Sequence, residues 1–148
     1  MKLHFSGHSD KYAIEQTMLT PFPGERPDYT AARSGEDNTL SPSWHESPAY
    51  GTATAILHRD GQTFRRVCRI RRPAEGTDEV SKTRLRRRTL QRAFYKAAVD
   101  ALGAEPPWGM LSGVRPVKLP VRAYLRGASW AAAERELRDL YRVSPPRR

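Results

Sequence analysis

"GTATAILHRDGQTFRRVCRIRR", residues 51 to 72, decides the fold of this chain. Asp60-Gly61 is a dipeptide preferred at the two central positions of a type I′ hairpin turn, and it lies between two segments of strand-like alternation. The turn fixes the register of the strands and therefore which side chains share a face. The pairs expected on the inward face are Leu57 with Phe64, Ala55 with Arg66 and Ala53 with Cys68, extended by Ile70. The sequence thus predicts an antiparallel hairpin with one apolar face.

The outward face of the hairpin is predicted to be polar and basic. Its side chains are Thr52, Thr54, His58, Arg65, Arg69 and Arg71. Arg66 is the exception on the inward face, so we expect it at the margin of the sheet or paired with an acid.

Two amphipathic segments are predicted to cover the apolar face, after a short strand near residues 2–5. Ser9 or Asp10 can cap a helix over residues 11–19. A second helix is expected from Ser81 to about Leu102, with Gly103 just past its end. The inward stripes are Ile14, Met18 and Phe22 in the first helix, and Leu90, Ala93, Phe94, Ala97, Ala101 and Leu102 in the second.

The predicted fold class is α+β, a small, mainly antiparallel sheet with packed helices followed by a helical C-terminal connector. We expect residues 1–104 to form the α+β domain, with a flexible insertion near residues 31–50 because that stretch is rich in Ser, Pro and acids. Residues 105–148 are predicted to form a junction rich in glycine and proline and then the connector. Its short helix begins at Pro116 or Pro120. Ser129 caps a last helix with Trp130, Ala133, Leu137, Leu140 and Tyr141 at helical spacing.

Composition narrows the class of protein. The 148 residues suit one compact domain, and the net charge of +10 favours an anionic partner, although an arginine-rich coding bias explains that charge equally well. The single cysteine excludes a disulfide framework and the usual cysteine-based metal sites. No stretch is apolar enough for a signal peptide or a membrane span, so we expect a cytoplasmic protein.

Six cations crowd the N-terminal half of the second helix, where the helix dipole disfavours positive charge. They are Lys82, Arg84, Arg86, Arg87, Arg88 and Arg92. Either Asp78 and Glu79 offset them, or the cluster meets an anionic surface.

The segment "PPWGMLSGVRPVKLP", residues 106 to 120, raises the question of a catalytic loop. A phosphate-binding loop needs Lys and Ser or Thr directly after its second glycine, and a nucleophile elbow needs Gly-x-Ser-x-Gly; the segment has neither. Arg115 and Lys118 are candidate anion contacts, since a rigid loop can present Arg to a carboxylate or phosphate. The favoured alternative is structural. In it, Arg115 binds a nearby carboxylate or helix-end carbonyls and so fixes the loop, and Trp108 packs the loop against the sheet.

The structural junction is predicted to consist of Trp108, Gly109, Gly113 and Pro116. No catalytic dyad and no metal-ligand spacing is found elsewhere. The histidines, which we expect on the surface or in turns, are His4, His8, His45 and His58.

The same segment resembles the Pro-Trp-Gly-x-Leu-x-Gly-x-Arg-Pro-x-Lys-Leu signature of HemZ-type oxygen-independent coproporphyrinogen III oxidases, also called coproporphyrinogen dehydrogenases. "GHSDKYAIEQTMLTPFPGE" (residues 7–25) resembles the opening strand and helix of that family, and "LQRAFYKAAVDALG" (residues 90–103) resembles the helix before the signature. The resemblance covers most of the chain apart from residues 31–50.

This resemblance implies a bacterial haem-biosynthesis enzyme that uses S-adenosylmethionine and a [4Fe–4S] cluster to decarboxylate two propionates of coproporphyrinogen III. The chemistry belongs to a radical-SAM barrel whose CxxxCxxC motif lies downstream of the matched region, and this sequence has no such motif. The chain therefore resembles the N-terminal accessory region, inactive alone, with no catalytic, cofactor or metal residue of its own. Its implied partners are the missing catalytic domain and a tetrapyrrole carboxylate or another anion.

A basic nucleic-acid-binding module is the alternative function. Against it, the sequence has no recognised nucleic-acid motif and no aromatic residues interleaved with cations to stack bases.

Overall fold

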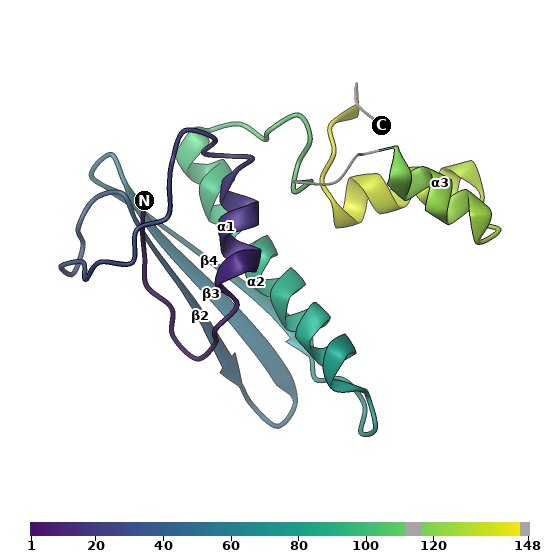
Figure 1. Cartoon of the computed structure of the whole chain (residues 1–148), viewed down its shortest axis with the longest axis horizontal. Coiled ribbons are helices and arrows are strands. Elements are labelled where there is room, and N and C mark those ends of the chain that lie inside the picture. Colours follow the sequence, from purple (N-terminus) through teal and green to yellow (C-terminus); the bar gives the residue numbers. More distant parts are fainter. Residues whose placement is uncertain (112–116, 146–148) are drawn as a thin grey trace.

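A four-stranded sheet with two helices packed on one face forms the larger part of the molecule (Figure 1). The computed structural model describes residues 1–111 and 117–145. The strands lie across the sheet in chain order: β1 (Lys2–Leu3), β2 (Thr39–Glu46), β3 (Tyr50–Arg59) and β4 (Gln62–Arg71). β1 runs parallel to β2, and the other neighbours are antiparallel. The helices are α1 (Lys11–Met18), α2 (Glu79–Leu102), α3 (Lys118–Leu125) and α4 (Trp130–Arg135), which continues into the π-helical turn η1 (Glu136–Leu140). The predicted α+β class is confirmed.

The hairpin has the predicted turn and register. Asp60 and Gly61 both have positive φ, 52° and 70°, as a type I′ turn requires. The inward pairs are Leu57 with Phe64, Ala55 with Arg66 and Ala53 with Cys68. Arg66 lies on the edge strand β4, and its guanidinium is bidentate to the Asp100 carboxylate on α2, so the predicted acid partner is confirmed.

The core fills the space between the sheet and α1 and α2. Its fully enclosed side chains include Ile14, Leu40, Ala53, Leu57, Ala93, Phe94 and Ala97. Small residues on β3 and α2 let the helix lie close to the hairpin, while the rings of Phe22 and Phe94 stack 6.4 Å apart. The predicted inward stripes are confirmed except at Leu102, which is 44% exposed because the chain leaves the helix at the left-handed Gly103.

Helix α2 begins two residues before the predicted start. The Asp78 carboxylate accepts a hydrogen bond from the Ser81 amide at 2.8 Å, so Asp78 is the N-cap and Ser81 lies within the first turn. On α4, by contrast, the Ser129 cap is confirmed, because its hydroxyl accepts from the Ala132 amide. Of the residues at helical spacing on this last helix, Ala133 and Leu137 are buried and Trp130 is 69% exposed.

The segment predicted to be a flexible insertion, residues 31–50, contains strand β2. This strand pairs with β1 on one side and with β3 on the other, so it lies inside the sheet. Leu40 and Pro42 are buried, and the Trp44 ring packs on the core beside Gly51. The prediction was wrong for residues 39–46, because Ser, Pro and acidic residues suggested disorder, whereas hydrogen-bonded pairing with β1 and β3 orders this stretch despite its composition.

The loop between β1 and α1 is held to β2 by a buried histidine. The side chain of His8 is fully buried; its Nδ1 accepts from the Asp10 amide at 3.2 Å, so Nε2 carries the proton and donates to the Pro42 carbonyl at 3.2 Å. Burial lowers the pKa of His8 from its ordinary 6.5, against the opposing effects of the Pro42 carbonyl and Asp10. His8 lies in a loop, as expected, but its ring belongs to the interior.

The hairpin turn gives a direct test of the register argument. Gly61→Ala should lower the free energy of unfolding by about 1–2 kcal/mol, because alanine is disfavoured at a φ of 70°. The matched control is Gly24→Ala, which has open space around it and no positive φ and should cost less than Gly61→Ala. Urea unfolding measures both variants, and equal losses would contradict the turn assignment.

His8 gives a second test, through the pH dependence of stability. The unfolded chain takes up a proton on His8 near pH 6.5, whereas the buried ring resists protonation, so stability should fall as the pH drops below about 6.5. His8→Gln should remove this component of the pH dependence, and His45→Gln, at an exposed position, should retain it. Urea unfolding between about pH 7.5 and about pH 5.5 covers that window, and an unchanged profile for His8→Gln would refute the prediction.

Candidate functional site

Of the two predicted anion contacts, only Lys118 belongs to the residues that the structure describes. Arg115 lies outside the described residues, as do Gly113 and Pro116 of the junction. Lys118 is exposed at the first residue of α3 and has no carboxylate within 4 Å among residues 1–111 and 117–145. Lys118 therefore remains available to an anion, while its pairing with Arg115 stays a prediction.

The junction before α3 is joined to the chain that follows η1. The Met110 amide donates to the Tyr141 carbonyl at 2.7 Å, and the Arg142 guanidinium donates to the Glu105 carboxylate at 2.6 Å. Gly109 has a φ of 59° and lies directly against the Tyr141 and Arg142 backbone, where a Cβ atom has no room. A small second apolar cluster forms here from Leu111, Leu119, Leu137, Tyr141 and Val143.

Trp108, the proposed wedge, is 37% exposed. The expectation that it fixes the loop against the sheet stays a prediction.

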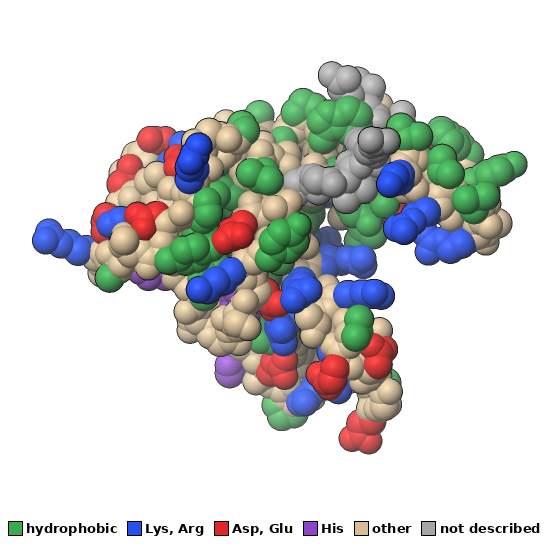
Figure 2. Space-filling model, viewed as in Figure 1, with side chains coloured by type: hydrophobic (Ala, Val, Ile, Leu, Met, Phe, Trp, Pro, Cys, Tyr) green, Lys and Arg blue, Asp and Glu red, His purple; other side chains and the backbone are tan. Residues whose placement is uncertain are grey.

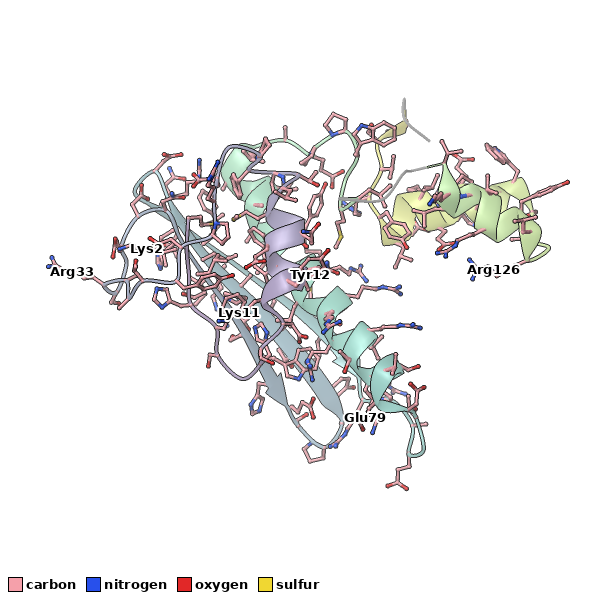
Figure 3. All side chains as sticks on the ribbon, viewed as in Figure 1. Lys2, Lys11, Tyr12, Arg33, Glu79 and Arg126 are labelled. Carbon is pink, nitrogen blue, oxygen red and sulfur yellow. The ribbon has the colours of Figure 1, made fainter. Side chains whose placement is uncertain are left out.

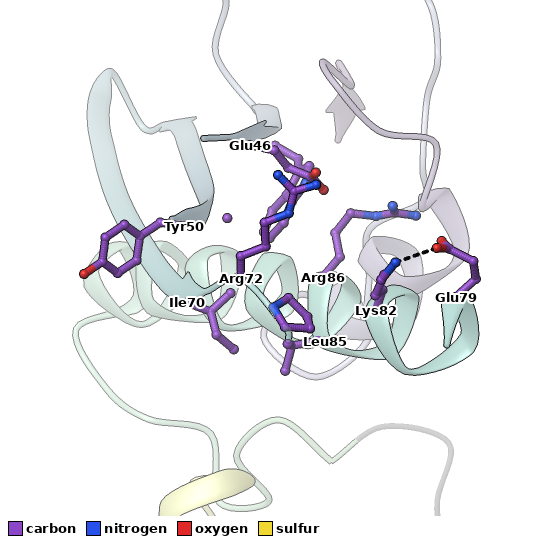
Figure 4. A pocket seen from close by; sticks show the side chains of 11 residues that line it. Glu46, Tyr50, Ile70, Arg72, Glu79, Lys82, Leu85 and Arg86 are labelled. Atoms are coloured by element: carbon purple, nitrogen blue, oxygen red, sulfur yellow. Dashed lines mark hydrogen bonds and ion pairs between the residues drawn. The ribbon is translucent and has the colours of Figure 1, made fainter. Parts of the chain in front are cut away.

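A pocket opens at the end of the sheet, beside the first turns of α2 (Figure 4). Its volume is about 190 Å³. Arg72, Lys82 and Arg86 bring positive charge to its wall, and Tyr50 and Trp44 bring aromatic rings. A more open hollow of about 580 Å³ shares Tyr50, Arg72 and Lys82 with it.

Most of the positive charge at this pocket is already neutralised. Lys82 donates to the Glu79 carboxylate at 2.8 Å, the ion pair drawn in Figure 4. Arg86 donates to the buried Asp10 carboxylate at 2.7 Å, and Arg87 donates to its other oxygen at 2.8 Å. Burial alone would raise the pKa of Asp10, but the hydrogen bonds from Arg86 and Arg87 outweigh it and hold the pKa below its usual value.

Asp10 therefore has a different role from the predicted one. It stands at the N-cap position of α1 but makes no capping hydrogen bond with its side chain, because both carboxylate oxygens face α2. Among the described residues, Arg72 is the one cation of the pocket wall without an acidic partner within 4 Å. Within the described residues, the pocket therefore offers one unpaired cation to an anion.

The exposed side of α2 carries a longer and unneutralised positive surface. Every fourth residue along it is a cation: Arg84, Arg88, Arg92 and Lys96, named here the α2 cation row. All four are exposed, on the helix face opposite Leu90, Phe94 and Ala97. Within the described part of the chain, none has a carboxylate oxygen within 4 Å. Like charges four residues apart destabilise a helix by roughly 0.2–0.5 kcal/mol per pair, so the row opposes folding.

The sequence allowed only part of the α2 cation row to be predicted. Its spacing could be read directly, but the six clustered cations could not be divided into paired and unpaired groups. The division depends on Asp10, which lies 76 and 77 residues away from the two arginines that it binds. Lys96, outside the predicted cluster, completes the row.

The outward face of the sheet is basic, as predicted. Arg65, Arg69 and Arg71 are exposed on β4, and the Arg69 guanidinium lies 5.6 Å from the centre of the Tyr50 ring. Within residues 1–111 and 117–145, no group of His, Cys, Asp and Glu side chains is arranged to hold a metal ion, and no helix is long and apolar enough to cross a membrane.

Gly109 provides a test of how the junction is held. Gly109→Ala should open the contact with the chain after η1, because the new Cβ would meet the Tyr141 and Arg142 backbone. Gly127→Ala is the matched control, since its φ is also positive, at 81°, but nothing lies within 4 Å of the added atom. Amide hydrogen exchange of residues 130–143 should rise far more for Gly109→Ala, and equal exchange in the two variants would exclude the close approach.

Comparison with known proteins gives no match: no family model, no curated protein and no solved structure matches the chain. Function has to be inferred from the residues and their geometry.

Proposed function

We propose that this chain is the N-terminal accessory region of a coproporphyrinogen dehydrogenase-like radical SAM protein of haem biosynthesis, and that it acts in the cytoplasm. It docks on a catalytic domain and turns over no substrate by itself. The proposal joins the resemblance of residues 7–25, 90–103 and 106–120 to one structural observation, the apolar surface of α3 and the start of α4.

That surface is unusual because α3 presents its larger apolar side to solvent. Leu119 packs on the small second cluster and Ala123 is buried, whereas the opposite side carries bulkier residues. The exposed residues are Val117 at 70%, Val121 at 49%, Tyr124 at 71%, Leu125 at 78% and, at the start of α4, Trp130 at 69%. The space-filling view shows hydrophobic side chains gathered over these helices (Figure 2). We name these five residues the α3 apolar surface.

The α3 apolar surface supports docking for a physical reason. The positions of Val117, Val121, Tyr124 and Leu125 repeat with helical spacing, which produces one continuous stripe along α3. A continuous exposed apolar patch is a feature of interaction sites, since burying it on a partner is favourable by about 25 cal/mol per Å² of apolar area. A catalytic domain that covers this stripe would remove it from water.

Lys118 lies at the beginning of the same helix. It is exposed beside the apolar stripe, which supports a role in binding an anionic group held between the accessory region and the catalytic domain. In this proposal the anion is a carboxylate of the tetrapyrrole, and the S-adenosylmethionine and [4Fe–4S] cluster belong to the catalytic domain.

A binding measurement tests the docking proposal. The chain is mixed with the radical-SAM catalytic domain of a coproporphyrinogen dehydrogenase from which the N-terminal region has been removed, and the complex is followed by sedimentation velocity. The double variant Tyr124→Ser, Leu125→Asp should weaken association at least tenfold, roughly 1.4 kcal/mol, because the docked stripe would then bury a charge. Val80→Asp, at an apolar residue 59% exposed on α2, is the control and should bind as the parent chain does.

Two results would contradict the proposal. One is the absence of association between the parent chain and the catalytic domain. The other is equal association of the parent chain and the α3 double variant, which would place the contact elsewhere.

A further inference from the structure

We propose that the α2 cation row binds the phosphate backbone of a double-stranded nucleic acid without reading its sequence. This activity goes beyond the accessory role proposed above, and it uses a different surface from α3. The observation that carries it is the division of the α2 cations into a group with acidic partners and a group without.

The paired cations of α2 have a structural role, which accounts for part of the positive charge of the helix. Arg86 and Arg87 join α2 to α1 through Asp10, and Lys82 pairs with Glu79 in the first turn. The remaining cations of that half of the helix, Arg84, Arg88 and Arg92, have no acidic partner within 4 Å among residues 1–111 and 117–145.

The geometry of the row suits a linear polyanion. Twelve residues separate Arg84 from Lys96, so the row extends for about 18 Å along a rigid helix at about 1.5 Å per residue. Long side chains project from α2 away from the sheet, on the side of the C-terminal helices (Figure 3). An anionic strand along this face would replace mutual repulsion among the four cations with attraction, which is charge complementarity of the kind that phosphate backbones provide.

The identity of the residues favours phosphates over bases. Three of the four are arginines, whose planar guanidinium can bind a phosphate through two hydrogen bonds. The aromatic residues nearest in sequence on α2, Phe94 and Tyr95, are 0% and 2% exposed, so neither can stack on a base. Without a stacking platform a single strand has no advantage, and a duplex, whose bases are already stacked, becomes the fitting partner.

The outward face of the sheet is a weaker candidate for the same ligand. Its arginines lie on the single strand β4, with the apolar Val67 between Arg65 and Arg69, and the Arg69 guanidinium already lies over the Tyr50 ring. This difference supplies a control of equal charge.

The test is fluorescence anisotropy with labelled random-sequence duplexes, one of RNA and one of DNA, titrated with the full chain over a range of salt. If each cation of the row neutralises one phosphate, a plot of the logarithm of the association constant against the logarithm of the salt concentration should have a slope of about −3.6 on duplex DNA. This value is four times the slope of about −0.9 expected for each neutralised phosphate. The row variant carries Arg84→Gln, Arg88→Gln, Arg92→Gln and Lys96→Gln, and it should bind at least tenfold more weakly with a slope near zero. It should fold, because the substitutions remove repulsion within α2, and circular dichroism checks this.

The control variant carries Arg65→Gln, Arg69→Gln, Arg71→Gln and Arg72→Gln, which lowers the formal net charge of +10 by the same four charges. Binding close to that of the parent chain supports the row, whereas an equal loss in both variants assigns binding to net charge alone and overturns the proposal. Tighter binding to a single-stranded oligonucleotide than to either duplex also overturns it, as does binding to vesicles of anionic lipid without binding to a duplex.

The docking proposal and the duplex-binding proposal can be tested independently, because each is expected to be affected by its own variant. The α3 double variant, Tyr124→Ser with Leu125→Asp, should bind the duplex as the parent chain does, and the row variant should still associate with the catalytic domain. A shared loss in either variant would overturn the separation of the two surfaces.

Discussion

The register of the β3–β4 hairpin is the constraint on which the rest of the structure depends. The left-handed conformations of Asp60 and Gly61 set the pairing of the strands, and the pairing brings Ala53, Ala55 and Leu57 to the face beneath α2. A shift by one residue would turn these side chains to solvent and place the opposite set under the helix. The same register aligns Arg66 with Asp100, so the margin of the sheet is joined to α2 by charge as well as by packing.

Asp10 organises the charge of the molecule in a similar way. A buried carboxylate needs strong partners, and two arginines from α2 supply them at the point where α1 begins. This arrangement fastens the helices to each other and uses part of the excess positive charge inside the fold. It also defines what is left over, because the cations on the opposite side of α2 have no comparable acid within reach in the described residues.

The molecule consequently presents two surfaces of different chemistry. The apolar stripe of α3 suits a protein partner, since the removal of apolar surface from water favours association. The α2 cation row suits a phosphate backbone, since an anion lying along it would offset the repulsion between like charges four residues apart. A single chain can hold both because the row lies on α2, whose inward face packs in the main core, and the stripe lies on α3, whose Leu119 packs on the second cluster.

The sequence by itself determined most features whose cause is local; the exception is the start of α2, where Asp78 rather than Ser81 is the cap. The turn dipeptide, the inward stripes of α1 and α2 and the caps at Gly103 and Ser129 could be read directly, because each depends on neighbours within a few residues. Strand β2 could not, since its order comes from β1 and β3 on either side rather than from its own composition. Only the tertiary structure decided which cations are paired, because Asp10 meets Arg86 and Arg87 through the packing of α1 on α2. The candidate surface could therefore be recognised as a cluster in the sequence, but its unpaired part became distinct only when the fold had neutralised the rest.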